Sequence, residues 1–307
     1  MAKAINFETL PREIRAALYR IDDPQTFTVE RFNQHSITVI NTRISRVYKA
    51  VRRNKRLITA FDREIDNLIL LRNKKIASPT PFNRQLFTSY EMIALLYIDG
   101  EIVVGNALPK HAAALADAQH KLHIAFDKDA RNKLAEWNSA RVLKPVFAKS
   151  NAEDFSSDFI KYARALQREL KSYELSREDM TFIHSDSHLS NVVFQPERAV
   201  LIDWAQAGWG SKFFELGVTI HALMAEKKAM HRELIGAYIE AYFGEAGPTE
   251  RDLELIDLHV KLRYLEQATW HLSETKDDQL LHRPKILRLI EDSLRKAQKF
   301  SIAGLLR

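Results

Sequence analysis

Asp186, Asn191 and Asp203 lie within one short segment, residues 184–203, and their types suit metal and proton chemistry. Asn191 and Asp203 flank two short runs rich in β-branched residues, 192–194 and 199–202, which predict an antiparallel hairpin. In that register the two side chains lie roughly opposite each other, at a Cβ separation of about 5 Å. An amide oxygen and a carboxylate so placed can share a hard cation such as Mg²⁺.

A second carboxylate precedes the hairpin. Asp186 lies five residues before Asn191, on the loop that enters the first strand. It is therefore expected near the cation without having to bind it. Phosphoryl transfer uses this combination, because one carboxylate accepts the proton of an attacking hydroxyl while an Asn and a second Asp hold the Mg²⁺ that bridges the nucleotide phosphates.

This spacing resembles that of a known family. The run His184-Ser-Asp-Ser-His-Leu-Ser-Asn191, followed twelve residues later by Asp203 in an Ile-Asp-Trp segment, resembles the catalytic loop and metal-binding segment of the aminoglycoside phosphotransferase and choline kinase family. The resemblance implies a small-molecule kinase that uses ATP and Mg²⁺. It makes Asp186 the catalytic base, His184 the residue that braces the loop, and Asn191 and Asp203 the metal ligands.

The sequence departs from the family pattern at three positions near this segment. Ser185 and Ser190 stand where the family most often has Gly, so a backbone that needs a positive φ would be strained there. Glu215 replaces the Asp of the Asp-Leu pair with which the family usually opens a helix.

The first part of the chain contains a lysine in an unusual setting. Three strand-like runs at residues 26–32, 37–40 and 44–51 predict an antiparallel meander, and Lys49 lies in the third of them among apolar neighbours. Burying an unpaired ammonium group is costly, so Lys49 should have a partner.

An amphipathic helix expected over residues 60–72 offers that partner, because Glu64 borders its apolar stripe and can face the sheet. The resemblance implies that Lys49 grips the α- and β-phosphates of ATP and that Glu64 pairs with it. Without the resemblance, the commoner explanation would be that Lys49 is a lysine on an edge strand and Glu64 a solvated helix residue.

Further contacts with the nucleotide follow from the resemblance. The loop at residues 33–36 would cover the phosphates, and since it contains no glycine, the hydroxyl of Ser36 is the expected donor. Two more strands are expected, at residues 84–90 and 91–98. Backbone groups near Leu95 and Tyr97 would then bind the adenine edge.

With these elements, the resemblance implies an α+β, bilobal, protein-kinase-like fold. A small N-lobe, residues 1–100, would hold the antiparallel sheet and one helix and bind the nucleotide. A larger, mainly helical C-lobe, residues 101–307, would carry the catalytic loop and the acceptor pocket. Helices are expected at residues 110–123, 155–173, 218–229, 232–243, 250–272 and 283–300.

The acceptor is not legible in the sequence. Glu266, Trp270, His271 and Glu274 lie near the end of one expected helix, and Trp209 follows the metal segment, so each could line the cleft. Core packing is the commoner explanation for aromatic residues at helical spacing, and also for His123 at a helix end. An antibiotic, a choline-like amino alcohol, a sugar and a nucleoside all remain open as acceptors.

Composition narrows the classes of function. The 46 basic and 40 acidic residues are mixed along the chain, so the net charge of +6 does not indicate a nucleic-acid partner, and it gives no support to the acidic cleft that a polycationic acceptor needs. The absence of cysteine excludes disulfides and thiolate chemistry. With neither a membrane-length apolar stretch nor a signal-peptide pattern, the expected location is the cytoplasm.

Other classes fit part of the pattern. His184, Asp186 and His188 alternate as the ligands of a metal-dependent hydrolase can, but Asn191 and Asp203 have no role in that account. A non-catalytic nucleotide-binding regulator of the same fold would suit the glycine-free loop. A degenerate kinase, however, would be expected to lack at least one of the five residues with expected kinase roles, and all are present: Lys49, Glu64, Asp186, Asn191 and Asp203. A protein kinase is disfavoured because the sequence has no Asp-Phe-Gly or Ala-Pro-Glu landmark.

Overall fold

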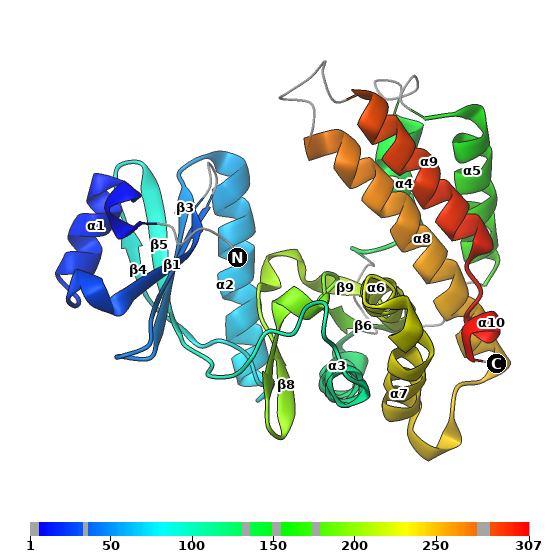
Figure 1. The fold of residues 1–307 in the computed structure, drawn as a ribbon, viewed down its shortest axis with the longest axis horizontal. Helices are drawn as coiled ribbons and strands as arrows, with labels where there is room; N and C mark the ends of the chain where they lie inside the picture. Colours follow the sequence, from blue (N-terminus) through cyan, green and yellow to red (C-terminus); the bar gives the residue numbers. More distant parts are fainter. Residues whose placement is uncertain are drawn as a thin grey trace. The chain divides into compact units, whose positions relative to one another are not determined.

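The computed structural model describes residues 6–32, 36–130, 136–148, 155–173, 179–274 and 283–306. The chain forms two compact units: Met1–Glu101 with Val200–Gln206, and Ile102–Ala199 with Ala207–Arg307. Figure 1 shows the elements of each unit.

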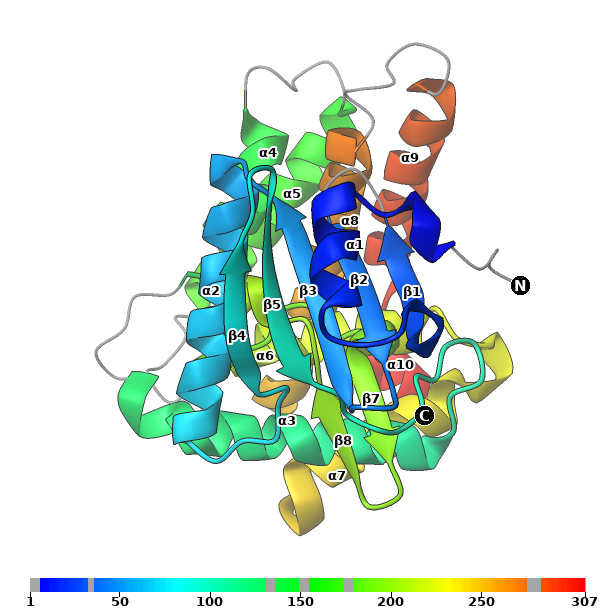
Figure 2. The same ribbon diagram turned by 90° about the vertical axis from the view of Figure 1, so that its left-hand side faces the viewer.

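The first unit is built on a five-stranded antiparallel sheet with the strand order β1-β2-β3-β5-β4 (Figure 2). The predicted meander is confirmed as its first three strands. The strands are β1 (Phe27–Phe32), β2 (Ser36–Asn41), β3 (Arg46–Arg52), β4 (Pro81–Leu86) and β5 (Tyr90–Leu96). β4 begins earlier than expected, and its Pro81 is tolerated because β4 is an edge strand.

Two helices lie on opposite faces of this sheet (Figure 1). α1 (Arg12–Tyr19) packs Ile14 and Leu18 into a core with one set of strand residues that includes Tyr48. α2 (Lys55–Asn73) lies on the other face and begins earlier than predicted, because the Asn54 side chain accepts the N–H of Leu57 and caps it. Since successive strand residues point to opposite faces, the residue after Tyr48 faces α2.

The second unit is mainly helical. Its helices are α3 (Pro109–Ala130), α4 (Ser139–Phe147), α5 (Ser157–Ser172), α6 (Lys212–Leu223), α7 (His231–Phe243), α8 (Glu250–Glu274), α9 (Arg283–Lys299) and α10 (Ile302–Leu306). The predicted helices are present, although α6 begins and ends earlier than expected. α4 and α10 were not predicted. None of the helices in the described ranges combines the length and apolar character of a membrane span.

Two small β-sheets carry the catalytic-loop segment. β6 (Met180–Ile183) pairs with β9 (Gly208–Ser211), and β7 (Val192–Gln195) pairs with β8 (Arg198–Leu201). The second pair is the predicted hairpin with a shorter turn. The first was not predicted because β9 is rich in glycine, yet Gly210 is required, since a Cβ there would lie 2.9 Å from the Cβ of Trp137.

Short 3₁₀ segments join these elements: Phe7–Thr9, Pro24–Thr26, Leu189–Asn191, Trp204–Gln206, Lys228–Met230 and Gly244–Ala246. Helices α6 and α8 pack closely against each other in the second unit. A Cβ at Gly217 of α6 would come within 2.7 Å of the backbone carbonyl carbon of His259 in α8. The glycine therefore sets how closely, and at which point along their length, these two helices pack.

Candidate active site

The catalytic loop leaves the end of β6 and is held by its own backbone. His184 is fully buried, and its Nδ1 accepts the N–H of Asp186 at 3.3 Å. The carbonyl of Asp186 accepts the N–H of His188 at 2.9 Å, which closes a tight turn. His184 thus lies where a bracing residue is expected, against the backbone of the predicted base.

The strain expected in this loop is confirmed at one of two positions. Ser185 has a φ of +65°, and its N–H donates to Oε2 of Glu215 at 3.0 Å. Glu215 is fully buried on α6, and its other oxygen accepts from Gln119 at 3.1 Å. The expectation for Ser190 is wrong, because Ser190 lies in a 3₁₀ turn with an ordinary φ, and its hydroxyl is 2.7 Å from Nδ1 of His188.

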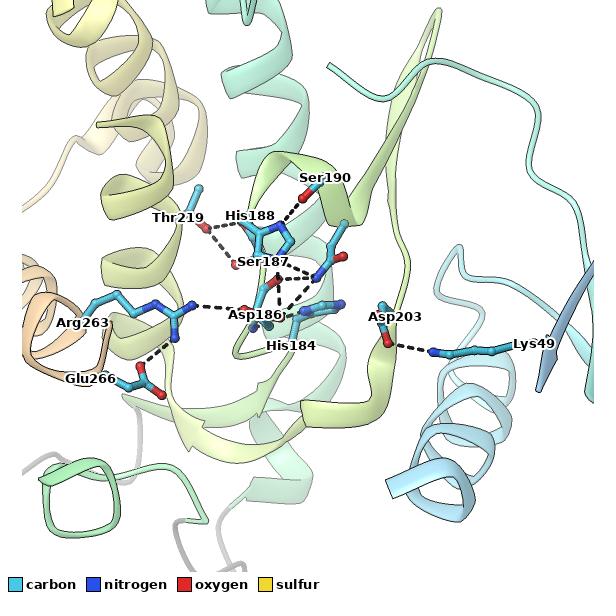
Figure 3. A network of polar contacts seen from close by, with 11 residues as sticks. Lys49, His184, Asp186, Ser187, His188, Ser190, Asp203, Thr219, Arg263 and Glu266 are labelled. Carbon is cyan, nitrogen blue, oxygen red and sulfur yellow. Dashed lines mark hydrogen bonds and ion pairs between the residues drawn. The ribbon is translucent and has the colours of Figure 1, made fainter. Parts of the chain in front are cut away.

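The Asp186 carboxylate is held at both oxygens (Figure 3). Oδ1 lies 3.1 Å from Nη2 of Arg263, while Oδ2 lies 3.3 Å from the amide nitrogen of Asn191 and 3.5 Å from Nε2 of His188. Burial raises the pKa of Asp186, but the contact with His188 and the charge of Arg263 outweigh it and lower that pKa to about 2. The carboxylate is therefore ionised at neutral pH.

Asn191 is oriented by acceptors on one side of its amide. Its Nδ2 donates to the backbone oxygen of Asp186 at 2.9 Å, and it lies 3.2 Å from Nε2 of His188. Because the nitrogen faces these groups, the atom that Asn191 can offer to a cation is its carbonyl oxygen. That oxygen is a suitable ligand for a hard divalent ion.

The predicted pair of Lys49 and Glu64 is confirmed within the first unit. Nζ of Lys49 lies 2.6 Å from Oε2 of Glu64 and 2.9 Å from Oδ1 of Asp203. Burial alone would lower the pKa of Lys49, but the two carboxylates raise it above its usual value. Asp203 as a second partner was not predicted, and its φ of +63° is uncommon for a residue with a side chain.

The remaining nucleotide contacts stay predictions. Ser36 is the first residue of β2, opposite Val51, whereas residues 33–35 of the expected phosphate loop lie outside the described residues. Leu95 lies within the β5 ladder. The N–H of Tyr97 donates to the carbonyl of Ser45 at 3.1 Å, so an adenine contact through that N–H would require this bond to open.

The residues considered for the acceptor pocket have different environments. Glu266 is 2.7 Å from Nη1 of Arg263, and Trp270 is 56% exposed. The side chains of His271 and Glu274 lie outside the described part of the chain. Trp209 packs edge-on against two buried aromatic rings, Phe182 of β6 and Phe126 of α3.

His123 is a packed core residue in this structure. Its ring is buried and Nδ1 lies 2.7 Å from the hydroxyl of Tyr242. Burial lowers the pKa of His123 to about 3, so the ring is neutral. This favours the packing explanation considered for the sequence.

Sequence reasoning missed Arg263, which contacts the predicted base. Arg263 lies on α8 three residues before Glu266, and this spacing places the two side chains on one helical face. The sequence contains that charge pair, but a charge pair on a helix is usually a surface feature. Only the packing of α8 beside the loop gives it a role.

No group of three or more His, Asp and Glu side chains in the described ranges is arranged to hold a metal ion. The metal-hydrolase alternative needs such a group around His184, Asp186 and His188, and it finds no support. A site made of one carboxylate and one amide oxygen, as proposed for phosphoryl transfer, requires no such group.

The chain has the protein-kinase-like fold that solved small-molecule kinases share. The model of the phosphotransferase enzyme family matches residues 37–255, which is most of the sequence. The chain belongs to that family. The comparison with curated protein sequences found no match.

Solved structures of small-molecule kinases share the fold. They include the amicoumacin kinase hAmiN in complex with AMP-PNP, Ca²⁺ and Ami (TM-score 0.71, 15% identity, 96% of this chain and 100% of that chain), a microcompartment-associated aminopropanol kinase (0.67, 16%, 95% and 98%), and the choline kinase LicA from Streptococcus pneumoniae (0.63, 13%, 94% and 100%). At these identities the likeness establishes the fold alone.

Proposed function

We propose that this protein is an ATP-dependent O-phosphotransferase that acts on a small hydroxylated molecule. The observation that carries the proposal is the Asp186 carboxylate, ionised and one-third exposed, in a loop that also orients Asn191. Family membership supports the same reaction. Residues 1–100 are proposed as the nucleotide-binding lobe, and residues 101–307 as the lobe that supplies the base and the acceptor pocket.

Asp186 is proposed as the general base. An ionised carboxylate can accept the proton of an acceptor hydroxyl as that oxygen attacks the γ-phosphorus atom. His184 keeps the loop in position through the N–H of Asp186. The proton acceptor is therefore fixed before the acceptor arrives, which lowers the entropic cost of reaching a reactive geometry.

Lys49 is proposed to bind the α- and β-phosphates. Its ammonium group is already held by Glu64 and Asp203, so it stays charged and near the expected position of the nucleotide. Ser36 is the proposed hydroxyl donor to the phosphates. Backbone groups of Leu95 and Tyr97 are the proposed contacts of the adenine edge.

The donors present fit a magnesium ion. The carbonyl oxygen of Asn191 and the carboxylate of Asp203 are hard oxygen ligands, as Mg²⁺ prefers. An ion held by these two side chains would supply positive charge that offsets the charge of the phosphates. Asn191 contributes orientation as well, since its nitrogen is already committed to Asp186.

Magnesium-dependent binding of ATP, measured by calorimetry, tests this function. We expect ATP to bind when Mg²⁺ is present and the affinity to be lost in Asp203→Ala. Asp62→Ala is a matched control, because Asp62 lies on α2 of the same unit in an exposed ion pair with Arg84. It should bind Mg-ATP as the wild type does.

Acceptor screening with the same sample completes the test. Phosphate transfer to an antibiotic, an amino alcohol, a sugar or a nucleoside would identify the acceptor class. If neither ATP nor GTP binds in the presence of Mg²⁺, the kinase proposal fails and the non-catalytic alternative has no nucleotide to bind either.

A further inference from the structure

Arg263 reaches the catalytic loop from a helix far along the chain. It projects from α8, and its Nη2 lies 3.1 Å from Oδ1 of Asp186, 77 residues away in sequence. Figure 3 shows the guanidinium between the loop and the carboxylate of Glu266. No step of the proposed reaction described above uses this contact.

The guanidinium is fixed at its other nitrogen as well. Nη1 lies 2.7 Å from Oε2 of Glu266, which is one helical turn further along α8. The side chains of Arg263 and Glu266 are only 21% and 18% exposed, so solvent competes weakly for these bonds. A planar guanidinium whose two terminal nitrogens are both hydrogen-bonded cannot turn without losing a charge-assisted hydrogen bond.

The position of α8 determines where this guanidinium lies. Gly217 of α6 permits the backbone of His259 to approach closely, and His259 is one turn before Arg263 on the same face. α6 also holds the loop directly, through the contact of Glu215 with the N–H of Ser185. The catalytic loop and the helix that carries Arg263 are therefore both packed against α6.

The two oxygens of Asp186 have separate partners. Oδ1 is held by Arg263, and Oδ2 lies 3.3 Å from the amide nitrogen of Asn191. Rotation of the carboxylate about its last torsion would break both contacts. Without Arg263 the carboxylate would keep partners at one oxygen only and could turn away from an incoming hydroxyl.

We propose that Arg263, held in place by Glu266, is a positioning residue that fixes the orientation of the Asp186 carboxylate for proton transfer. This rests on the proposed function, because it assumes that Asp186 is the base. The rate of the chemical step depends on this geometry, whereas binding of ATP to the lysine cluster of the first unit does not. Loss of Arg263 therefore lowers kcat and leaves the KM for ATP unchanged.

The test compares Arg263→Gln, Arg263→Lys and Glu266→Gln with the wild type. The readout is Mg-ATP turnover, with water as the acceptor at first and then with any acceptor found by screening. We expect Arg263→Gln to lower kcat about 10- to 100-fold, since small displacements of catalytic groups have effects of that size. The KM for ATP should change less than about twofold, as expected for a group that acts only in the transition state.

Two variants separate positioning from general damage. Arg263→Lys retains the charge and should recover part of the lost kcat. Arg251→Gln is the matched control. Arg251 lies on the same helix, but its ion pair, at 2.7 Å, is with Asp179 and not with the catalytic loop. Its kcat should equal that of the wild type.

A double-mutant comparison tests whether Arg263 acts through the base. In an Asp186→Asn background, Arg263→Gln should cause no further loss of kcat. An additional loss of the same size as in the wild type would overturn the inference.

The two proposals fail in different ways. A wild type that neither transfers phosphate nor hydrolyses ATP overturns the proposed function and the inference with it. An active wild type whose Arg263→Gln variant retains its kcat, or loses kcat and ATP affinity in equal measure, overturns the inference alone.

Discussion

Two ion clusters of this protein have the same charge composition and different side chains at their centres. In the first unit an ammonium group, Lys49, lies between Glu64 and Asp203. In the second a guanidinium, Arg263, lies between Glu266 and Asp186. In each, one carboxylate comes from a helix and the other from the segment that carries the catalytic motif.

The difference between the two cations suits their proposed tasks. A lysine is a point charge on a flexible stem, so it can follow phosphate groups whose positions change during the reaction. An arginine is a rigid fork that holds a carboxylate in one orientation. Two clusters of equal charge can therefore have different functions, because the geometry of the central cation suits one to ligand binding and the other to positioning.

Substitutions of Asp186 and Asp203 should have the largest effects, and the two residues should affect different steps. Asp186→Asn should lower the rate of phosphate transfer about 10²- to 10⁴-fold, the usual range for loss of a general base. Its affinity for Mg-ATP should stay at the wild-type level, whereas Asp203→Asn should lose that affinity. Transfer kinetics and calorimetry on both variants measure this. Wild-type transfer by Asp186→Asn would show that another group is the base.

The two bracing glutamates should differ in their effect on stability. Glu64→Gln should lower the free energy of unfolding by about 1.5–3 kcal/mol, the contribution of a hydrogen bond to a charged group, because the Glu64 side chain is only 6% exposed. Glu266→Gln should lower it less and should affect kcat instead. Urea unfolding of both variants checks the order, and a reversed order would contradict the comparison.

Adding one methyl group at Gly217 tests the contact between α6 and α8, the helix that carries Arg263. Gly217→Ala would place a Cβ within 2.7 Å of the His259 backbone, and overpacking of this kind costs about 1–3 kcal/mol of unfolding free energy. It should also lower kcat, since it displaces the helix that carries Arg263.

Gly236→Ala on α7 is the matched control for that substitution. Its added Cβ would meet no atom within 4 Å, so it should stabilise the protein by about 0.4–1 kcal/mol by restricting the unfolded chain. Thermal unfolding measures both variants. Equal melting temperatures for the two would show that α6 can shift without cost.

Acid should destabilise the second unit through its buried histidines. Burial lowers the pKa of His123 to about 3 and that of His259 to about 4, whereas unfolded histidine titrates near pH 6.5. Below about pH 6.5 the unfolded chain therefore binds protons that the folded chain does not, and the free energy of unfolding falls as the pH falls, down to the folded pKa values. Stability should not depend on these two groups above about pH 7.5.

The slope of that dependence provides the measurement. Each of these histidines contributes up to about 1.4 kcal/mol per pH unit. His259→Gln should reduce the slope between pH 6 and pH 4.5 by about one such contribution. An unchanged slope would show that His259 is protonated in the folded state.

The sequence by itself determined most of the elements and, within the first cluster, the pair of Lys49 and Glu64. Short strand-like runs separated by turns predicted the meander and placed Lys49 in its third strand. A lysine in an apolar strand requires a partner for electrostatic reasons, and Glu64 on the next helix was the one within reach. The catalytic motif was legible because its three residue types occur at fixed spacings within a single short segment.

Only the tertiary structure decided the second cluster. Arg263 and Asp186 are 77 residues apart, and no local pattern relates them. Their contact depends on how closely α6 and α8 pack, which in turn depends on the missing side chain of Gly217. The small β6–β9 sheet was missed for a similar reason, because a glycine-rich strand carries little periodic signal and forms where close packing requires glycine. Local propensities specify elements, whereas contacts between distant elements are fixed by packing, and the proposed positioning of the base depends on packing of this kind.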